Sequence, residues 1–402
     1  MAARTVYMDH SATTPVDPRV VEAMLPYFTE IYGNSASIHR FGRAAAKALE
    51  ESRRTVAAIL GCNPMEIVFT GSGTESDNLA LRGVALAQRR AGRGNHLIVS
   101  SVEHHAVLNT ARQLEEVFGF EVTYLPVDEY GMVNPDDVGR AIRKDTVLIS
   151  VMYANNEVGT IQPIPEIARI ARAKGIPFHT DAVQAGGMLD LNVNRLGVDL
   201  MTLSAHKFYG PKGVGVLYIR QGTPYLPTIT GGGHERGRRA GTVNVAGIVG
   251  LATALRLAQE SRESENARLR RLRDRLIRGI LERVPDARLT GHPTERLPHH
   301  ASFIFRGING EELLLALDVE GVAASTGSAC TSGRAEPSEV LVAMGLPHDW
   351  AIGSLRLTLG KSSTDEDIDY VLDVLPRVVA RLREMQAVEV GEAEQARPGH
   401  RG

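Results

Sequence analysis

The chain has 402 residues, more than one hydrophobic core normally holds, so two domains are expected. Its composition is ordinary for a globular protein, and the formal net charge of −2 argues against a broad nucleic-acid-binding surface. It has two cysteines, too few for a disulfide framework, no apolar run as long as a membrane span and no signal-peptide pattern at its start. We therefore expect a cytoplasmic protein with free thiols that binds neither nucleic acid nor membrane.

A repeated pattern of short apolar runs and helical stretches occupies residues 65–220. Each run is rich in β-branched residues and precedes small or polar residues, which is typical of βαβ units. The runs are EIVFT (66–70), HLIVSS (96–101), TVLISVMY (146–153), IPFHTD (176–181), DLMTLSAH (199–206) and GVGVLYIR (213–220). We expect a mainly parallel sheet with helices on both faces, and such sheets bind ligands at the carboxyl ends of their strands.

The pattern changes after residue 220. The segment GGGHERGRRAGTVN (231–244) is rich in glycine and arginine and predicts a loop. The segment ENARLRRLRDRLIRGILERV (265–284) predicts a helix, because apolar residues recur three or four positions apart at Leu269, Leu272, Leu276 and Ile280. We interpret the arginines of this helix as a solvent-facing side; a nucleic-acid-binding patch is the alternative.

A second α/β unit is indicated beyond that helix. Its signals are the strand-like HASFIF (300–305), the helical EELLLALDVEG, a further strand in SLRLTLGK (354–361) and a closing helix that Thr364 and Asp367 begin as a capping box. The predicted organisation is a large domain at residues 16–260, a smaller α/β domain formed by residues 1–15 and 261–386, and a disordered tail at residues 387–402.

A lysine stands at the end of one predicted strand. Lys207 lies in SAHKFYGPKGVG (204–215), with Ser204 and His206 beside it. A lysine held in a cleft usually forms a covalent bond or acts as a base, and a Schiff base with an aldehyde cofactor uses both properties. The alternative is an ordinary loop lysine, which is the role we assign to Lys212.

An acid follows another strand, in IPFHTDAVQAGG (176–187). An unpaired carboxylate behind an apolar run costs desolvation energy, and a pyridinium nitrogen would satisfy Asp181 and keep such a ring protonated. Gln184 could hydrogen-bond the ring hydroxyl. The alternative for Asp181 is a helix N-cap.

Three further strand ends carry polar groups. GSGTESDN (71–78) opens a helix where Thr74 and backbone N–H groups could bind a phosphate, although its spacing is not the dinucleotide fingerprint. His104, in VEHHAV (102–107), could stack on a cofactor ring and move protons, or could be a satisfied loop histidine. Asn156 follows the next strand. A lysine, an acid, an amide, a histidine and a phosphate loop on one sheet edge together indicate pyridoxal phosphate.

With these motifs in place, the chain resembles the cysteine desulfurases of the NifS/IscS type, in the class V aminotransferase branch of the type I pyridoxal-phosphate fold. The resemblance extends from residue 7 to residue 361. It departs from the family's common pattern at Ser35, where proline is usual, and at Gly73, where alanine is usual. The motifs that carry it are YMDHSATTP, YGNSASIH, VEHHAV, YANNEVGTIQP, HTDAVQ, SAHKFYGPKG, GGGHERGRRAGT, STGSACTSG and SLRLTLGK.

The resemblance implies a role for each matching residue. Lys207 is the implied Schiff-base lysine, His104 the stacking histidine, and Asn156 and Arg356 the contacts to the substrate carboxylate. Asp181 would meet the pyridine nitrogen and Gln184 the ring hydroxyl. The implied phosphate cradle consists of Gly73, Thr74, Ser204 and His206, joined by Thr242 from a second subunit of a homodimer.

Cys330 stands among small residues in STGSACTSG (325–333), with nothing apolar to pack against. The resemblance implies that its thiolate takes sulfur from L-cysteine, leaving alanine and a persulfide, and passes the sulfur to an iron–sulfur scaffold or another acceptor protein. His104 is the candidate proton acceptor for a thiol. As a persulfide, Cys330 could also be a transient iron–sulfur ligand. The alternatives are an unreactive loop thiol, the role assigned to Cys62; a selenocysteine lyase or another class V lyase or aminotransferase; and a scaffold that has lost catalysis.

Overall fold

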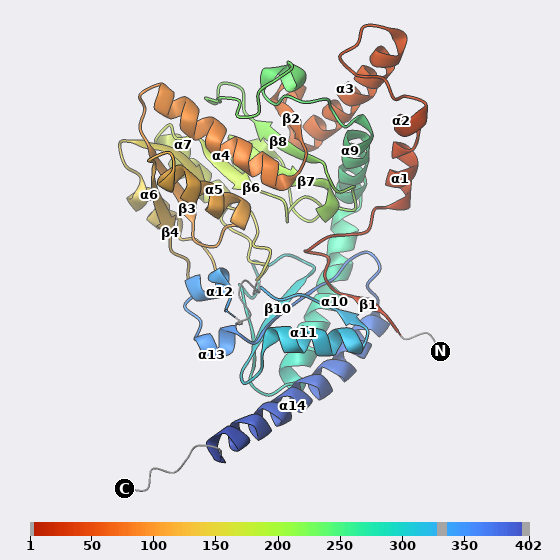
Figure 1. Cartoon of the computed structure of the whole chain (residues 1–402), viewed down its shortest axis with the longest axis vertical. Helices are drawn as coiled ribbons and strands as arrows, with labels where there is room; N and C mark the ends of the chain where they lie inside the picture. The colour runs from red at the N-terminus through yellow and green to blue at the C-terminus, as the bar shows by residue number, and fades with distance from the viewer. Residues whose placement is uncertain (1–3, 328–335, 396–402) are drawn as a thin grey trace.

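The computed structural model describes residues 4–327 and 336–395, with side chains described up to residue 386. The chain forms a large domain around a seven-stranded sheet and a small domain around a three-stranded sheet, and α10 (Arg262–Arg283) runs from one to the other (Figure 1). The α/β architecture with a mainly parallel central sheet confirms the predicted fold class. The exact domain boundaries stay a prediction.

The central sheet has the strand order β2-β8-β7-β6-β5-β3-β4. Its strands are β2 (Ile67–Thr70), β3 (His96–Ser100), β4 (Glu121–Leu125), β5 (Thr146–Ser150), β6 (Phe178–Asp181), β7 (Leu200–Ser204) and β8 (Gly215–Ile219). β8 is antiparallel to both of its neighbours, and the other neighbouring pairs are parallel. Every predicted run is a strand here, whereas the edge strand β4 was not predicted.

Side chains along each strand alternate between the two faces of the central sheet, and this divides the large-domain core into two layers. In β3, Ile98 packs into one hydrophobic cluster while Leu97 and Val99 pack into another, because successive side chains point to opposite faces. One face is covered by α4 (Gly73–Arg90) and α5 (His105–Glu116). The other is covered by α3 (Arg40–Leu60), α6 (Pro135–Ala141), α7 (Ile164–Ala173), α8 (Val193–Leu196) and α9 (Val245–Glu260).

The remaining elements of the large domain are short. α1 (Pro18–Met24) and α2 (Pro26–Thr29) pack on α9, and 3₁₀ turns occur at Pro64–Glu66, Ala205–Lys207 and His234–Gly237.

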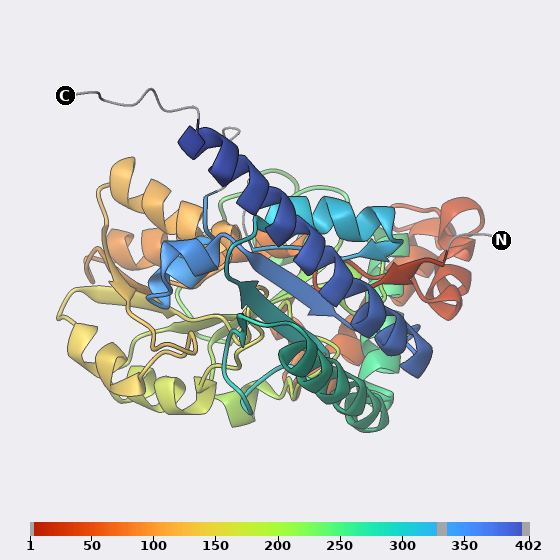
Figure 2. The same ribbon diagram turned by 90° about the horizontal axis from the view of Figure 1, so that it is seen from below.

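The small domain has its own core. Its antiparallel sheet has the order β12-β10-β9, and β1 pairs with β11 in a separate parallel ladder. Viewed from below, α14 crosses this domain beside α11 (Figure 2). The elements are β1 (Val6–Tyr7), β9 (Ala287–Leu289), β10 (His300–Phe305), α11 (Gly310–Val319), β11 (Val322–Ala323), α12 (Glu339–Ala343), α13 (His348–Ala351), β12 (Ser354–Thr358) and α14 (Asp365–Gln395).

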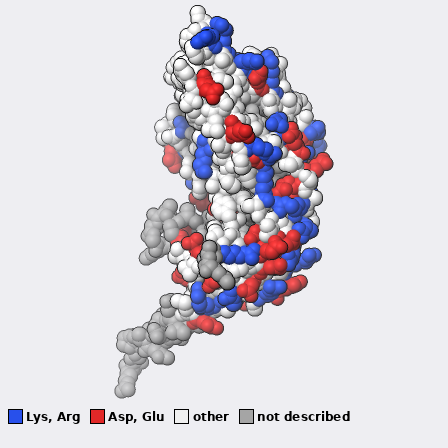
Figure 3. Space-filling model, turned by 90° about the vertical axis from the view of Figure 1, so that its right-hand side faces the viewer, with Lys and Arg blue, Asp and Glu red and all other residues white. Residues whose placement is uncertain are grey.

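Helix α10 presents the two sides that its sequence predicted. Its apolar stripe is buried in the small-domain core, at Leu269, Leu272, Leu276 and Ile280. On the outer side, both terminal nitrogens of Arg271 donate to Asp365 at 2.7 Å, and Arg275 donates to the same carboxylate at 3.1 Å. Basic and acidic side chains are interleaved over the lower part of the face in Figure 3. Arg271 and Arg275 therefore lie on the solvent side beside neutralising acids, whereas Arg273 of the same helix is buried and donates to the Leu297 backbone oxygen at 3.0 Å.

Helix α14 begins as predicted and continues further than predicted. Thr364 Oγ1 accepts from the backbone of Asp367 at 3.2 Å, and Asp367 Oδ2 accepts from the backbone of Thr364 at 3.0 Å, which completes the capping box. The prediction of a disordered tail from residue 387 is wrong for its first part, because the helix continues to Gln395. Alanine, glutamate and glutamine in that stretch favour helix despite its polar, aperiodic pattern. Residues 396–402 lie outside the described ranges.

A buried ion pair fixes the 231–244 loop to the large domain. Glu235 accepts from both terminal nitrogens of Arg53 at 2.9 Å and from the Phe69 N–H at 2.9 Å. The two charged side chains are 2% and 1% exposed. Removing one partner of such a pair leaves an uncompensated buried charge.

We expect Glu235→Ala to destabilise the large domain by about 3 kcal/mol, because Arg53 would stay buried with only Glu50, on its Nε, as a counter-charge. The expected result is a clearly lower midpoint of thermal unfolding. The matched control is Glu260→Ala, which breaks the exposed pair between Arg256 and Glu260 and should shift the midpoint far less. Equal midpoints for the two variants would contradict the assignment.

None of the helices in the described ranges is both long and apolar enough to cross a bilayer. The cytoplasmic location stays a prediction.

Candidate active site

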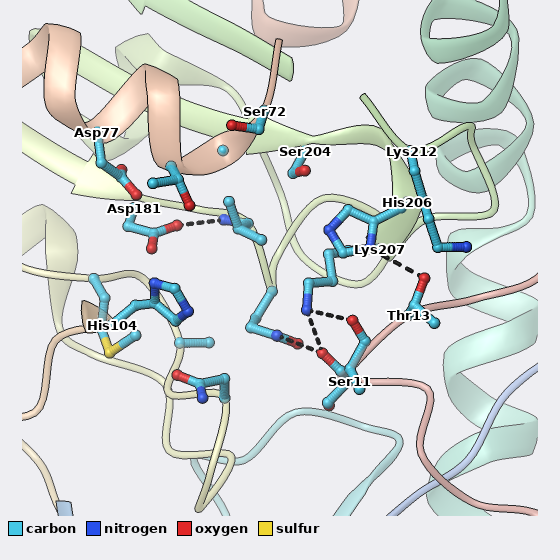
Figure 4. Close-up of a pocket in the computed structure, with 18 of the residues that line it drawn as sticks. Ser11, Thr13, Ser72, Asp77, His104, Asp181, Ser204, His206, Lys207 and Lys212 are labelled. Carbon is cyan, nitrogen blue, oxygen red and sulfur yellow. Dashed lines mark hydrogen bonds between the residues drawn. The ribbon is translucent and has the colours of Figure 1, made fainter. Parts of the chain in front are cut away.

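A cavity of about 590 Å³ lies at the carboxyl ends of the parallel strands (Figure 4). Most of the predicted site residues line it together, although they come from segments far apart in the sequence. Those residues are Gly73, Thr74, His104, Asn156, Asp181, Gln184, Ser204, His206, Lys207 and Arg356.

Lys207 ends the 3₁₀ turn that follows β7, and its amine points into the cavity. Its Nζ donates to the backbone oxygens of Ser11 at 2.6 Å and Ala12 at 2.8 Å. Burial lowers the pKa of Lys207 to about 8, helped by the positive charge of Arg356 and opposed by Asp181. The amine is therefore mostly protonated near neutral pH, but its unprotonated fraction is much larger than that of a free lysine.

Asp181 is the last residue of β6 and lies on the opposite side of the cavity (Figure 4). One carboxylate oxygen accepts from the Val183 N–H at 2.9 Å, and no ion pair in the described part of the chain includes this residue. Burial raises its pKa, while His104 and Lys207 act in the opposite direction. It does not cap a helix, so the N-cap alternative is not what the structure has.

His104 caps the amino end of α5 beside Asp181. Its Nδ1 accepts from the Ala106 N–H at 3.1 Å, which places the proton of the neutral ring on Nε2. Burial lowers its pKa, so the ring is neutral near pH 7. The ring therefore presents an N–H donor, and it can accept a proton at Nε2 only if Nδ1 becomes the protonated nitrogen and gives up the cap bond. The role of His104 as proton acceptor stays a prediction.

The amino end of α4 forms another wall. Gly73 and Thr74 open this helix, and the N-cap Ser72 accepts from the Glu75 N–H at 3.0 Å. A Cβ on Gly73 would approach the Ser204 Cβ to 3.2 Å, so the glycine lets helix and strand end pack closely. The first N–H groups of a helix lack intrahelical acceptors and favour an anion.

Two basic residues stand at the same end of the cavity. His206 Nδ1 shares a hydrogen bond of 3.1 Å with Thr13 Oγ1, and burial lowers its pKa to about 4, so it is a neutral group here. Lys212, for which we predicted an ordinary loop role, lines the cavity instead.

Arg356 lies in the middle of β12, so the small domain contributes this residue to the lining of the cavity. Its Nη1 donates to the Asn156 backbone oxygen at 2.9 Å and its Nη2 donates to Asp9 at 2.9 Å, while its buried Nε has no partner among the described residues. These two bonds fix the guanidinium in place. Gln184 Nε2 donates to the Ser11 oxygen at 3.0 Å, the same oxygen that Lys207 contacts.

One predicted site residue of the described chain does not line this cavity. Thr242 is exposed and is absent from the cavity lining. Cys330 lies outside the described residues, and its role stays a prediction. The other cysteine, Cys62, is half-buried, and burial followed by the charge of Glu66 raises the pKa of its thiol to about 12, which keeps it in the unreactive thiol form.

The structure adds residues that the sequence did not single out. Asp77 lines the cavity from inside α4, where burial and the nearby Asp181 raise its pKa. Asp9 could have been noticed as the acid of the YMDHSATTP motif. Ser11, Ala12, Thr13 and Ser72 also contribute. Among the described residues, no cluster of three or more histidine, cysteine or acidic side chains could hold a metal ion.

The cavity fits pyridoxal phosphate on two observations. Asp181 is a buried carboxylate without a cation, which suits a protonated ring nitrogen. The amino end of α4 lies beside Ser204 and Lys212, which suits a phosphate. The volume is in the range of small-molecule sites.

Comparison with known proteins identifies relatives over nearly the whole chain. The family described as Aminotransferase class-V matches residues 6–371. A protein named cysteine desulfurase IscS from Methanosarcina thermophila is 55% identical over 382 residues, covering 95% of this chain and 94% of its own. Another of that name, from Dictyoglomus turgidum, is 53% identical, covering 94% of this chain and 96% of its own.

Solved structures agree with these relatives. A NifS-like protein superposes with a TM-score of 0.88 at 40% identity, covering 94% of this chain and all of the other. A structure described as SspA in complex with cysteine superposes with a TM-score of 0.78 at 37% identity, covering 88% and 99%. The chain therefore belongs to the class V aminotransferase family, in its branch of NifS/IscS-type cysteine desulfurases.

Proposed function

We propose that this protein is a cysteine desulfurase that converts L-cysteine to L-alanine and holds the released sulfur on Cys330 as a persulfide. The observation that carries the proposal is one cavity that holds a partly unprotonated lysine, Lys207, opposite a buried carboxylate, Asp181. The relatives named cysteine desulfurase and the neighbour solved with cysteine support the same substrate.

Pyridoxal phosphate, when bound here, supplies the electron sink that lets an amino acid lose its Cα proton. Asp181 would face its ring nitrogen, Gln184 its hydroxyl and His104 its ring. Lys207 would hold its aldehyde. The phosphate would lie at the amino end of α4, against Gly73, Thr74, Ser204 and His206, with Thr242 of a second subunit.

Lys207 and Arg356 carry the steps on the substrate. Arg356 and Asn156 would hold the carboxylate of L-cysteine, because the guanidinium has more N–H donors than the two bonds to Asn156 and Asp9 occupy. The Lys207 amine can accept the Cα proton, because its lowered pKa leaves part of it unprotonated near neutral pH.

The sulfur step needs no external oxidant. The Cys330 thiolate attacks the sulfur of L-cysteine, a sulfur–sulfur bond forms, and the bond between that sulfur and Cβ breaks with its electron pair on the carbon side. Cβ is reduced and takes a proton to become the methyl group of alanine, while the two sulfur atoms are oxidised to a persulfide. We propose that an acceptor protein of iron–sulfur cluster assembly then receives the outer sulfur. Transient ligation of iron by that persulfide is part of the same proposal.

A homodimer would complete the site. The face formed by α1, α2 and the start of α3 exposes large apolar side chains, a pattern that marks interaction surfaces. They include Leu25, Phe28, Tyr32 and Ile38, which are 58%, 60%, 64% and 90% exposed. Burial of that face against a second copy would remove these side chains from water and could deliver Thr242 to the partner's cavity.

Incubation with L-cysteine tests the proposal. We expect the peptide containing Cys330 to gain the mass of one sulfur atom, in a form that a thiol reductant removes, with one alanine formed per sulfur bound. The measurement is peptide mass spectrometry after alkylation, with L-alanine as the control substrate. An unmodified Cys330 peptide alongside alanine production would overturn the proposed role of this cysteine.

A further inference from the structure

A second cavity, of about 360 Å³, adjoins the first. The two share His104, Asn156 and Arg356 as wall residues. The other walls of the second cavity include the two segments that flank residues 328–335, namely 325–327 and 336–340. The chain that carries Cys330 therefore leaves and rejoins the described structure beside the proposed substrate-carboxylate site.

A half-buried acid, Glu157, lines this second cavity. It directly follows Asn156, and its own N–H donates to Asn155 Oδ1 at 2.8 Å, as does the N–H of Val158 at 2.9 Å. This turn fixes the backbone of Glu157 relative to the active site. Burial raises the pKa of its carboxyl group to about 7. The hydrogen bonds of this turn involve only the backbone of Glu157, so its carboxyl group must find hydrogen-bond donors elsewhere.

Both flanking segments meet at the Glu157 carboxyl group. Ser338 Oγ donates to Glu157 Oε2 and accepts from the Val340 N–H at 3.1 Å as the N-cap of α12. On the other flank, a Cβ on Gly327 would overlap Glu157 Oε2, so the Gly327 backbone lies directly against this carboxyl group. That same Cβ would lie 3.1 Å from the Ser338 Cβ, so the two flanks are also in contact with each other.

The first flank, residues 325–327, is also hydrogen-bonded to β12, the strand that carries Arg356. Ser325 and Arg356 exchange backbone hydrogen bonds of 3.2 and 2.7 Å, and Thr326 Oγ1 lies 2.5 Å from Ser354 Oγ. The segment before residue 328 is thus held in a fixed position against β12. The hydrogen bond from Ser338 to Glu157 fixes the segment after residue 335 to the same region.

We propose that Glu157 is a positioning residue for sulfur transfer, which holds the two flanks of the Cys330 segment together beside the cavity. This inference rests on the proposed function of Cys330. Fixing both ends of a loop removes conformations in which the thiol is far from the substrate, and so raises its effective concentration there.

Two variants and a matched control test this role. Glu157→Ala removes the carboxyl group, and Glu157→Gln keeps an oxygen that can accept from Ser338. The control is Glu260→Gln, the same acid-to-amide change at a residue outside the lining of both cavities, where the exposed side chain pairs with Arg256 at the surface. The measurements are the single-turnover rate of sulfur arrival on Cys330, the KM for L-cysteine, cofactor absorbance and the thermal midpoint.

We expect Glu157→Ala to slow sulfur arrival roughly 10- to 100-fold, the scale of a small misplacement of a reacting group, with KM and cofactor absorbance close to the unmodified protein. Glu157→Gln should restore most of the rate, and Glu260→Gln should behave as the unmodified protein. Ser338→Ala should slow the same step, and combining it with Glu157→Ala should add little, because both remove one interaction.

An unchanged rate in Glu157→Ala overturns the inference. A slower rate together with a raised KM, weaker cofactor absorbance and a lower thermal midpoint also overturns it, because that result indicates a general structural role. If Glu157→Ala does not fold, Ser338→Ala decides alone, since it removes only a hydroxyl group. Failure of the unmodified protein to place sulfur on Cys330 would instead refute the proposed function, so the two failures are distinguishable.

Discussion

Lys207→Ala is expected to abolish covalent attachment of pyridoxal phosphate and to reduce turnover of L-cysteine by roughly 10²- to 10⁴-fold, the range typical of removing a positioned acid–base group. The amine is buried, hydrogen-bonded to two carbonyls and shifted to a pKa of about 8, whereas Lys212, the other lysine of the cavity lining, is exposed. The measurements are borohydride reduction followed by peptide mapping, and alanine production.

Lys207→Arg tests whether the positive charge of Lys207 is enough, or whether an amine that can lose its proton is required. A guanidinium keeps the positive charge but stays protonated and cannot take the Cα proton, so this variant should be as inactive as Lys207→Ala. Lys174→Ala removes an exposed lysine and serves as the control. Turnover near the original level in either Lys207 variant would show that the reaction does not use this amine.

Cys330→Ser is expected to keep the visible absorbance of the bound cofactor and to lose sulfur transfer from L-cysteine by on the order of 10³-fold or more, as when other covalent nucleophiles are removed. The hydroxyl of serine is a far weaker nucleophile than a thiolate and cannot hold a persulfide. Sulfide release in the presence of a reductant and cofactor absorbance are measured on the same sample.

Cys62→Ser is the matched control, because it makes the same change at the other cysteine. The thiol of Cys62 has a pKa raised to about 12 by burial, so it should not contribute nucleophile at neutral pH. Sulfur transfer should therefore survive in Cys62→Ser. If Cys330→Ser instead retained transfer and Cys62→Ser lost it, the assignment of the two thiols would be reversed.

Much of the site could be predicted because parallel strands end at the same edge of a sheet. Lys207 and Asp181 were found from their positions after apolar runs, and both line one cavity. Asp9 was missed, because its contact with Arg356 spans 347 positions of sequence. Lys212 was assigned an ordinary role, since nothing local shows that the turn after Lys207 returns it to the cavity.

The errors in the fold have local causes. β4 was not predicted, because it is an edge strand whose side chains are mostly half-buried or exposed, so its apolar signal is weak. The tail was predicted from polarity and lack of period, whereas α14 continues through part of it. The alanine, glutamate and glutamine residues of that stretch favour a helix by propensity, and the prediction had relied on periodicity alone.

The sequence by itself determined the strands, the capping box of α14 and the chemical identity of the reactive groups, because each depends on neighbouring residues and their side-chain chemistry. The tertiary structure alone decided which groups meet, how far burial shifts the pKa of Lys207 and Asp181, and that Glu157 joins Gly327 to Ser338. Burial and contacts between distant segments arise only when the two domains pack, and no local pattern encodes them.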